Sequence, residues 1–496
     1  MRTIGRFAVS VASVLALAVP MVATASVPTP SSARTGLASA PLSQSGRWIT
    51  DASGRVVVLH GLNEVYKVAP YLPSAAGFGD DDAAFLAANG FNAMRVGVIW
   101  AAVEPQPGQY DDAYLDGIAA TVRTLAAHGI VSLLDFHQDL YNEKFQGEGA
   151  PAWAVQDGGR PNLPLGFPGN YLANPAEWHV WDQFWRNAKA ADGIGLQDHY
   201  ARTWAHVATR FRADPAVAGY EVINEPWPGT TWPLCAVPLV GCPIFDQTLT
   251  AFYKRVDTAI RTVDTTHTVW LEPNTLFTQV GATHIGFAGD ARTGFAYHDY
   301  CSTEELTANN ALCPPQDELT VGTASRYAQA HAVPPLLTEF GATNDLPNIA
   351  LLVSLTDKYR TGWLEWAYTG HDKTSASPNG QALVLDPNQP PSGANVLTDK
   401  LKALTQPYPQ VVAGTPSAWS TKAGTFRLTY TTARADAQGR FAAGAQTEIA
   451  VPAIQYPHGY SVQVSGAQVL SAAGAPTLRL ASLPGATTVQ VTVAAG

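Results

Sequence analysis

The fold is decided by the stretch Asp112–Phe136, which reads DAYLDGIAATVRTLAAHGIVSLLDF. Its first part places apolar residues at helical spacing, so that they share one stripe: Leu115, Ile118, Ala119, Val122, Leu125 and Ala126. Gly129 is a typical stop signal for such a helix, and Val131–Phe136 is an apolar run of strand length. The stretch therefore predicts a helix over 112–128 followed by a buried strand.

Apolar runs of the same kind recur between residues 56 and 366, alternating with helical patterns such as Leu346–Arg360. There are eight of them: Val56–Leu62, Asn92–Val98, Val131–Phe136, Ala218–Ile223, Thr268–Leu271, Phe295–Tyr297, Leu336–Phe340 and Trp363–Trp366. Eight strand–helix units predict an α/β fold, a (β/α)8 TIM barrel, over residues 44–406. We expect long insertions at 138–170 and 227–246, which are rich in Pro, Gly and Trp.

The sequence changes character after about residue 407. Helical patterns become sparse, while Thr, Val, Ala and Gly become frequent, and short alternating runs appear at Thr425–Thr431, Glu448–Val451, Ser461–Val464 and Thr487–Val493. This pattern predicts a small all-β sandwich domain over residues 407–496.

The composition excludes several classes of function. The 496 residues carry a formal net charge of -10, with Lys+Arg 30 against Asp+Glu 40. A nucleic-acid binder needs a basic face for phosphates, and a polybasic membrane tether needs clustered cations, so neither fits. Apolar residues make up 46% of the chain, which is enough for a large core. A globular enzyme or binding protein remains, and we expect a monomer with no nucleic-acid partner.

The first residues resemble a secretory leader. Arg2 and Arg6 precede an apolar run that ends in Ala23-Thr24-Ala25, so residues 1–25 are interpreted as a signal peptide cleaved after about Ala25. A membrane anchor is the alternative, although the run is shorter than the roughly 20 residues that a spanning helix needs. Residues 26–43 are rich in Ser, Pro, Thr and Ala and are interpreted as a flexible lead-in to a secreted enzyme.

The four cysteines agree with export. Their spacing favours the local disulfides Cys235–Cys242 and Cys301–Cys313, although four cysteines allow three connectivities. A zinc site is the other interpretation, but the sequence contains no CxxC pair.

Barrel enzymes carry out their chemistry at the carboxyl ends of the strands. Polar residues at or just after the ends of the predicted strands are Arg95, Asp135, His137, Asp139, Asn224, Glu225, His298, Asp299, Tyr300, Glu339, Glu365 and Trp366. Among them, Glu225 and Glu339 end the fourth and seventh runs and could face each other across the barrel mouth. Glycoside hydrolysis needs such a pair, one carboxyl to protonate the leaving oxygen and one to meet the anomeric carbon.

The neighbouring residue types suit that chemistry. Arg95 and Tyr300 are candidate partners for an ionised nucleophile. Asn224 could hydrogen-bond a sugar 2-hydroxyl, and Trp366 could form an apolar floor under a sugar ring. Glu365 is expected to point away from the site, because Trp366 occupies the opposite face of its strand.

Together these residues resemble glycoside hydrolase family 5, of clan A. The motifs that carry the resemblance are His60-Gly61-Leu62-Asn63, Arg95, Asp135-Phe136-His137, Asn224-Glu225-Pro226, His298-Asp299-Tyr300, Thr338-Glu339-Phe340-Gly341 and Trp366. Within the family the chain is similar to endoglycoceramidases and endogalactosylceramidases, from about residue 44 to the end. That closer likeness rests on His137-Gln138-Asp139 and on residues 149–154, 181–185 and 407–416.

The resemblance implies retaining hydrolysis of the β-glycosidic bond between an oligosaccharide and ceramide, with Glu339 as nucleophile and Glu225 as acid/base. It implies that Lys67, Asp139 and Trp366 hold the first sugar, and that neither a metal nor an organic cofactor takes part. The segment before Lys67 is shorter than in lactosylceramide-cleaving relatives, whereas Asn142-Glu143-Lys144 is closer to the galactosylceramide-type branch. The identity of the first sugar therefore stays open.

Two alternatives remain. An endo-β-glucanase or mannanase on the same scaffold would have a long open groove, and a non-catalytic glycolipid-binding protein would keep the fold without turnover. One local feature favours a lipid aglycone: the segment 227–240 that follows Glu225 is strongly apolar. We expect it to contact ceramide or a membrane surface transiently.

Overall fold

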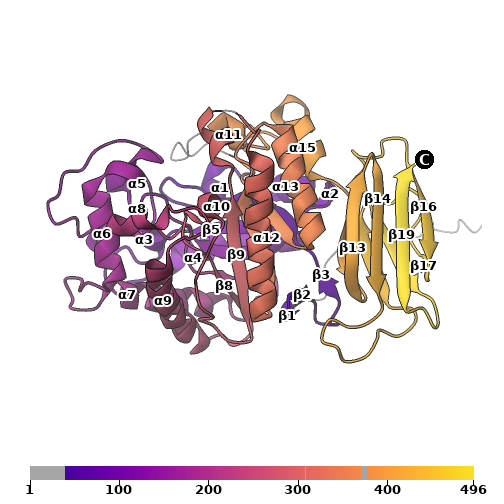
Figure 1. Cartoon of the computed structure of the whole chain (residues 1–496), viewed down its shortest axis with the longest axis horizontal. Coiled ribbons are helices and arrows are strands. Elements are labelled where there is room, and N and C mark those ends of the chain that lie inside the picture. Colours follow the sequence, from indigo (N-terminus) through magenta and orange to yellow (C-terminus); the bar gives the residue numbers. More distant parts are fainter. Residues whose placement is uncertain (1–39, 308, 370–377) are drawn as a thin grey trace, which may run out of the picture. The chain divides into compact units, whose positions relative to one another are not determined.

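The computed structural model describes residues 40–307, 309–369 and 378–496 (Figure 1). The expected signal peptide and residues 26–39 of the expected lead-in lie outside these ranges. Within them, every helix is too short or too polar to span a lipid bilayer.

Eight parallel strands close into a barrel in the order β10-β11-β4-β5-β6-β7-β8-β9. Their bounds are β4 (His60–Glu64), β5 (Ala93–Val98), β6 (Val131–Phe136), β7 (Val217–Glu221), β8 (Thr268–Leu271), β9 (Thr293–Asp299), β10 (Pro335–Phe340) and β11 (Gly362–Glu365). Each lies on one of the expected apolar runs, so the predicted TIM barrel is confirmed.

The first predicted strand is wrong in its extent, because Val56–Leu62 serves two sheets. Val56–Val57 forms β3 of a separate antiparallel sheet, and the barrel strand begins only at His60. Side chains alternate along this connection: Val56 and Val58 enter the core of the C-terminal sheets, whereas Val57 and Leu59 enter an apolar cluster shared with the barrel strands. A continuous apolar run carries no sign of the point where the chain changes sheets.

The helices around the barrel follow the apolar stripes of the sequence. Helix α4 (Asp112–Ala127) begins where the Asp111 side chain accepts a hydrogen bond from the Tyr114 amide, and its stripe is buried. The other long helices are α7 (Leu196–Phe211), α9 (Pro243–Arg261), α12 (Cys313–His331) and α13 (Leu346–Tyr359) (Figure 1). They bury the outer faces of the strands and hold the strand ends in register.

The two expected insertions fold into short helices. The first contains the 3-10 turns η1 (Glu143–Phe145) and η2 (Ala152–Ala154), and it is followed by α5 (Gly169–Ala173) and α6 (Pro175–Trp185). The second contains the 3-10 turn η3 (Gly229–Thr231) and α8 (Trp232–Cys235). Asp182 of α6 accepts hydrogen bonds from both the amide and the hydroxyl of Thr230, at 3.1 and 2.8 Å. The second insertion is therefore anchored on the helix that follows the first.

The C-terminal region forms two antiparallel sheets, as the sandwich prediction requires. One sheet has the order β13 (Thr415–Lys422), β14 (Thr425–Thr431), β19 (Thr488–Ala495) and β16 (Tyr460–Ser465). The other has the order β1 (Ser43–Ser45), β2 (Trp48–Thr50), β3, β12 (Tyr408–Val412), β15 (Gln446–Ala450), β18 (Thr477–Ser482) and β17 (Ala467–Val469). Strands β1 to β3, which precede the barrel in the sequence, therefore belong to the same sheet as strands that follow the barrel. The two sets are joined by the pairing of Val57 with Val411.

Candidate active site

The predicted site residues gather at the carboxyl ends of the barrel strands. Arg95 lies on β5, His298 on β9 and Glu339 on β10, whereas Asn224 and Glu225 follow β7. All are buried, and Glu225 and Glu339 are 8% and 4% exposed. The parallel strands present these side chains to one shared space because their carboxyl ends meet at one end of the barrel.

Glu225 and Glu339 meet across this space. One carboxylate oxygen of each, together with a ring nitrogen of His298, all lie within 4.8 Å of one another. His298 Nδ1 is 3.1 Å from Glu225 Oε1 and 3.5 Å from Glu339 Oε2, so the imidazole lies between the two acids. The juxtaposition expected from two strand ends far apart in the sequence is present.

Glu339 is surrounded by donors that stabilise negative charge. The Arg95 guanidinium donates to its Oε1, and the Tyr300 hydroxyl donates to its Oε2 at 2.8 Å. Arg95 is held in turn by Glu221 at 2.7 Å and Asp135 at 3.0 Å. Such charge-assisted hydrogen bonds favour an ionised carboxylate at Glu339.

Glu225 is in a different environment. Burial, together with the negative charge of Asp139, raises the pKa of Glu225 to about 7. Burial also lowers the pKa of the neighbouring His298 to about 4, so this imidazole is neutral near pH 7. Two carboxyls with such different surroundings are poised to act as an ionised group and a proton donor at the same pH.

The backbone of Glu225 adopts the left-handed conformation, with φ 45°. Its carbonyl accepts hydrogen bonds from Gln138 Nε2 at 3.1 Å and Thr275 Oγ1 at 2.8 Å, and its amide donates to Glu272 Oε2 at 2.9 Å. The sequence analysis missed Glu272, although the strand-end argument could have found it. Glu272-Pro273-Asn274 directly follows β8, a strand whose carboxyl end contributed none of the predicted site residues.

Lys67, His137, Asp139 and Trp366 form a second cluster. Lys67 and Asp139 make a buried ion pair, and the Lys67 ammonium lies 4.3 Å from the centre of the Trp366 ring. The His137 ring stacks parallel to the same indole at 5.2 Å. Because Trp366 is only 5% exposed, its ring is mostly covered by these neighbours.

Protein contacts also occupy His137 and Asn224. Burial and the charge of Lys67 would lower the pKa of His137, but its hydrogen bond to Asp135 and the nearby carboxylate of Asp139, 3.8 Å from Nε2, overcome this effect and raise the pKa to about 9. Asn224 Oδ1 accepts from Arg95 at 2.9 Å, and its amide donates to the Gln138 carbonyl at 2.9 Å. Glu365, expected to point away, is buried in an ion pair with Lys400 at 2.7 Å.

Three groups of acidic and His side chains bring possible metal-ligand atoms within 4.8 Å of one another: His137, Asp139 and Glu148; Glu221, Glu272 and His298; Glu225, His298 and Glu339. Each group contains a carboxylate that already pairs with a buried cation, either Lys67 or Arg95. These ion pairs reduce the negative charge available to a further cation.

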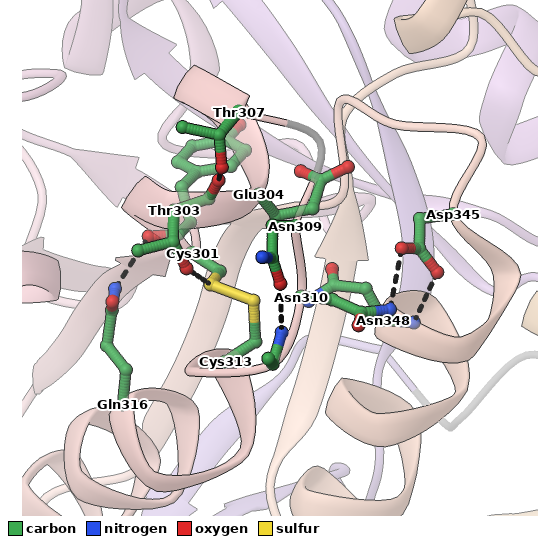
Figure 2. Close-up of a disulfide and its surroundings, with 12 residues drawn as sticks. Cys301, Thr303, Glu304, Thr307, Asn309, Asn310, Cys313, Gln316, Asp345 and Asn348 are labelled. Atoms are coloured by element: carbon green, nitrogen blue, oxygen red, sulfur yellow. Dashed lines mark hydrogen bonds between the residues drawn. A yellow bond between two sulfur atoms is a disulfide. The ribbon is translucent and has the colours of Figure 1, made fainter.

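Both expected disulfides are present. Cys301–Cys313 joins the residue after Tyr300 to the first residue of α12 (Figure 2), and Cys235–Cys242 closes the loop after α8. Gln316, in the first turn of α12, donates to the Tyr300 carbonyl at 3.0 Å. The Cys301–Cys313 disulfide thus fixes the segment that brings the Tyr300 hydroxyl to Glu339.

The loop closed by the other disulfide exposes apolar side chains. We define the apolar tip as Leu234, Val237, Leu239, Val240 and Ile244, which are 45% to 78% exposed. The tip backbone is anchored, because the Leu239 amide donates to the Val280 carbonyl at 2.8 Å and His284 Nε2 lies 2.7 Å from the Val240 carbonyl. No charged residue occurs from 226 to 245.

A closed parallel barrel with a buried pair of glutamates at its carboxyl end is an arrangement that glycoside hydrolases use. Residues 51–374 match Cellulase (glycosyl hydrolase family 5), and residues 406–493 match the glycoside hydrolase family 5 C-terminal domain. The chain therefore belongs to glycoside hydrolase family 5.

Relatives extend the similarity over most of the chain. Endoglycoceramidase I of Rhodococcus hoagii (strain 103S) is 34% identical over 452 residues, which cover 88% of this chain and 84% of the relative. Endoglycoceramidase of Hydra vulgaris is 27% identical, over 84% of this chain and 81% of its own length. The structure of endo-glycoceramidase II from Rhodococcus sp. in complex with ganglioside GM3 matches with a TM-score of 0.73 and 27% identity, covering 90% of this chain and 99% of that one.

Proposed function

We propose that this glycoside hydrolase cleaves the β-glycosidic bond between oligosaccharide and ceramide in glycosphingolipids, with retention of configuration. The observation that carries the mechanism is that a carboxylate oxygen of Glu225 lies within 4.8 Å of a carboxylate oxygen of Glu339. Retaining enzymes use carboxyls about 5–5.5 Å apart, whereas inverting enzymes need roughly 6.5–9.5 Å to admit water.

The reaction proceeds in two displacements. Glu339 attacks the anomeric carbon as the bond to the ceramide oxygen breaks, and the Glu225 proton passes to that oxygen. Water then gives a proton to Glu225 and attacks the same carbon, which releases the sugar and the Glu339 carboxylate. Arg95 and Tyr300 stabilise the negative charge of Glu339 before the first step and after the second.

The first sugar is held by the second cluster. Lys67 and Asp139 donate to and accept from its hydroxyls, and Asn224 donates to the 2-hydroxyl. Trp366 contacts the sugar with the small part of its indole that Lys67 and His137 leave uncovered. His137 fixes Asp139 and the indole from behind. The names of the relatives and the ganglioside bound to one of them support a glycosphingolipid as the substrate.

The test offers a mixed pool of glycosphingolipids to the enzyme, with carboxymethylcellulose and mannan assayed in parallel. The expected products, identified by mass spectrometry, are intact oligosaccharides and free ceramide, and the Glu339→Gln variant should release neither. Preferential cleavage of a polysaccharide would instead support the endoglucanase or mannanase alternative. Full turnover by Glu339→Gln would refute the assigned nucleophile and revive the binding-protein alternative.

We also propose that the apolar tip contacts the surface of the lipid bilayer that holds the substrate. It belongs to the segment that follows Glu225 in the chain, carries no charge and exposes apolar side chains. Changing Val237, Leu239 and Val240 to Ser should spare a soluble aryl glycoside and weaken cleavage of glycolipid in vesicles. Changing Val469 and Leu470, exposed apolar residues of the C-terminal sheets, to Ser should affect neither assay.

Two further proposals concern the mature protein. The leader directs export and is removed after about Ala25, which N-terminal sequencing of the exported protein tests. The enzyme acts as a monomer, which light scattering during size-exclusion chromatography tests.

A further inference from the structure

Glu225 occupies a backbone conformation that a non-glycine residue adopts only when its surroundings enforce it. Its φ is 45°, in the left-handed region where the Cβ is crowded. Strained residues at reactive sites persist because several neighbouring contacts fix them. The position of the Glu225 carboxyl therefore depends on whatever holds its two flanking peptide groups.

The contacts on the two sides of Glu225 differ. The carbonyl has two donors, Gln138 Nε2 and Thr275 Oγ1, so either can support it alone. The amide donates to Glu272 Oε2 at 2.9 Å, and the structure gives it no second acceptor among the described residues. Glu272 is thus the acceptor that fixes the N–H of the amino-side peptide group, whereas the carbonyl of that group, which belongs to Asn224, accepts from Gln138 Nε2 at 2.9 Å.

We propose that Glu272 is a positioning residue for catalysis, whose carboxyl holds the Glu225 amide and thereby aims the Glu225 carboxyl at the leaving oxygen. This inference rests on the proposed role of Glu225 as the acid. Glu272 is well placed for the task because it is 2% exposed and its own backbone is fixed by Tyr253 of α9. The Tyr253 hydroxyl donates to the Glu272 carbonyl and accepts from its amide.

Glu272 also reaches the other neighbour of the acid. Its Oε1 lies 3.6 Å from His298 Nδ1, the atom that is 3.1 Å from Glu225 Oε1. One side chain therefore borders both the backbone of Glu225 and the imidazole beside its carboxyl. Glu339 is held by other donors, Arg95 and Tyr300, so movement of Glu272 would shift the acid more directly than it would shift Glu339.

The amide needs an acceptor, and the acceptor need not carry charge. Burial, together with the negative charges of Glu221 and Glu225, raises the pKa of Glu272 well above its usual range, which favours the neutral carboxyl. A neutral carboxyl accepts through its carbonyl oxygen, and a glutamine side chain offers the same oxygen at the same reach. Leucine has a similar size and no acceptor.

The test compares Glu272→Gln with Glu272→Leu on dinitrophenyl, nitrophenyl and phenyl glycosides, which depend increasingly on protonation of the leaving group. For Glu272→Leu we expect kcat/KM on the phenyl glycoside to fall by about ten- to hundredfold, with little loss on the dinitrophenyl glycoside. Glu272→Gln should stay within about threefold of the wild type on all three, since it keeps the acceptor. A positioning role predicts this dependence on the leaving group, which general damage to the fold would not produce.

Two reference variants complete the design. Glu225→Ala should show the same dependence on the leaving group more strongly. Asp257→Leu places leucine at a different buried carboxyl, this one on α9, and should behave as the wild type. Equal losses on all three glycosides for Glu272→Leu, no loss on any, or a Glu272→Gln variant as impaired as Glu272→Leu would each overturn the proposal. If Glu225→Ala lacks the dependence on the leaving group, the assignment of Glu225 as the acid fails. If the wild-type enzyme cleaves aryl glycosides but not glycolipid, only the proposed substrate is refuted.

Discussion

The Tyr300 hydroxyl donates a 2.8 Å hydrogen bond to Glu339 Oε2, the carboxylate oxygen on the side opposite the one that Arg95 holds. The two residues come from adjacent barrel strands, because Tyr300 follows β9 and Glu339 lies on β10. In the proposed mechanism, this bond places a neutral donor where the negative charge of Glu339 is consumed in the first step and restored in the second.

Tyr300→Phe removes this donor and keeps the ring. A hydrogen bond to a charged group contributes about 1.5–3 kcal/mol, so we expect kcat to fall by about ten- to hundredfold with a small change in KM. Steady-state kinetics on an aryl glycoside measure the effect. Tyr297→Phe is the matched control and should retain wild-type kcat. Tyr297 lies on β9, the strand that Tyr300 follows, but it is buried among apolar residues that include Phe295. Equal losses in the two variants would contradict the assigned role.

The pH dependence of kcat/KM should reflect Glu225. Its pKa is raised to about 7, and the first step of the proposed mechanism uses its protonated form. Activity on a phenyl glycoside should therefore fall as pH rises through about 7, approaching about tenfold per pH unit. A dinitrophenyl glycoside needs little protonation and should show a weaker decline. A flat profile for the phenyl glycoside well above pH 7 would exclude Glu225 as the acid.

Arg95 should stabilise the barrel as well as Glu339, the proposed nucleophile. Arg95→Met would leave Asp135, Glu221 and Glu339 buried together without their cation. Removing one partner from a buried ion network costs about 3–5 kcal/mol, and urea denaturation should show this loss in the free energy of unfolding. Arg210→Met breaks an exposed ion pair with Asp116 and should cost at most about 1 kcal/mol. Similar losses for the two variants would show that the Arg95 network does not stabilise the fold.

The two disulfides should differ in their effect on catalysis. Changing both members of either pair to Ser should lower the free energy of unfolding by about 2–3 kcal/mol, because both loops are short. Only the Cys301/Cys313 variant should also lower kcat on an aryl glycoside, since its disulfide fixes the segment that carries Tyr300 (Figure 2). Thermal unfolding and kinetics on both variants check this. A larger loss of kcat in the Cys235/Cys242 variant would contradict it.

The sequence predicted the barrel because each strand–helix unit carries its own local signal. The apolar helical stripe, the stop signal and the apolar run of the next strand occur together around Gly129. The predicted strands also end in the residues of the candidate site. The meeting of Glu225 and Glu339 followed from topology alone, since parallel strands in a barrel share one carboxyl end. Glu272 could have been predicted in the same way, because it follows the carboxyl end of β8.

Other features depend on tertiary packing and have no local signal. The Lys67–Asp139 ion pair and the covered Trp366 ring arise where loops from different strands pack together. The division of the run Val56–Leu62 between two sheets depends on Val411, a partner far along the chain. Alternation marks a buried strand but does not say which sheet buries it.

The pairing of β3 with β12 makes the C-terminal sheets inseparable from the start of the catalytic region. A shortened protein that ends before Tyr408 would leave Val56 and Val57 with an open hydrogen-bonding edge and uncovered apolar side chains. During synthesis these two valines cannot pair with β12 until the barrel strands have been made, because β12 follows the last of them in the sequence. Grafting the tail onto another barrel would accordingly require transplanting residues 43–57 with it.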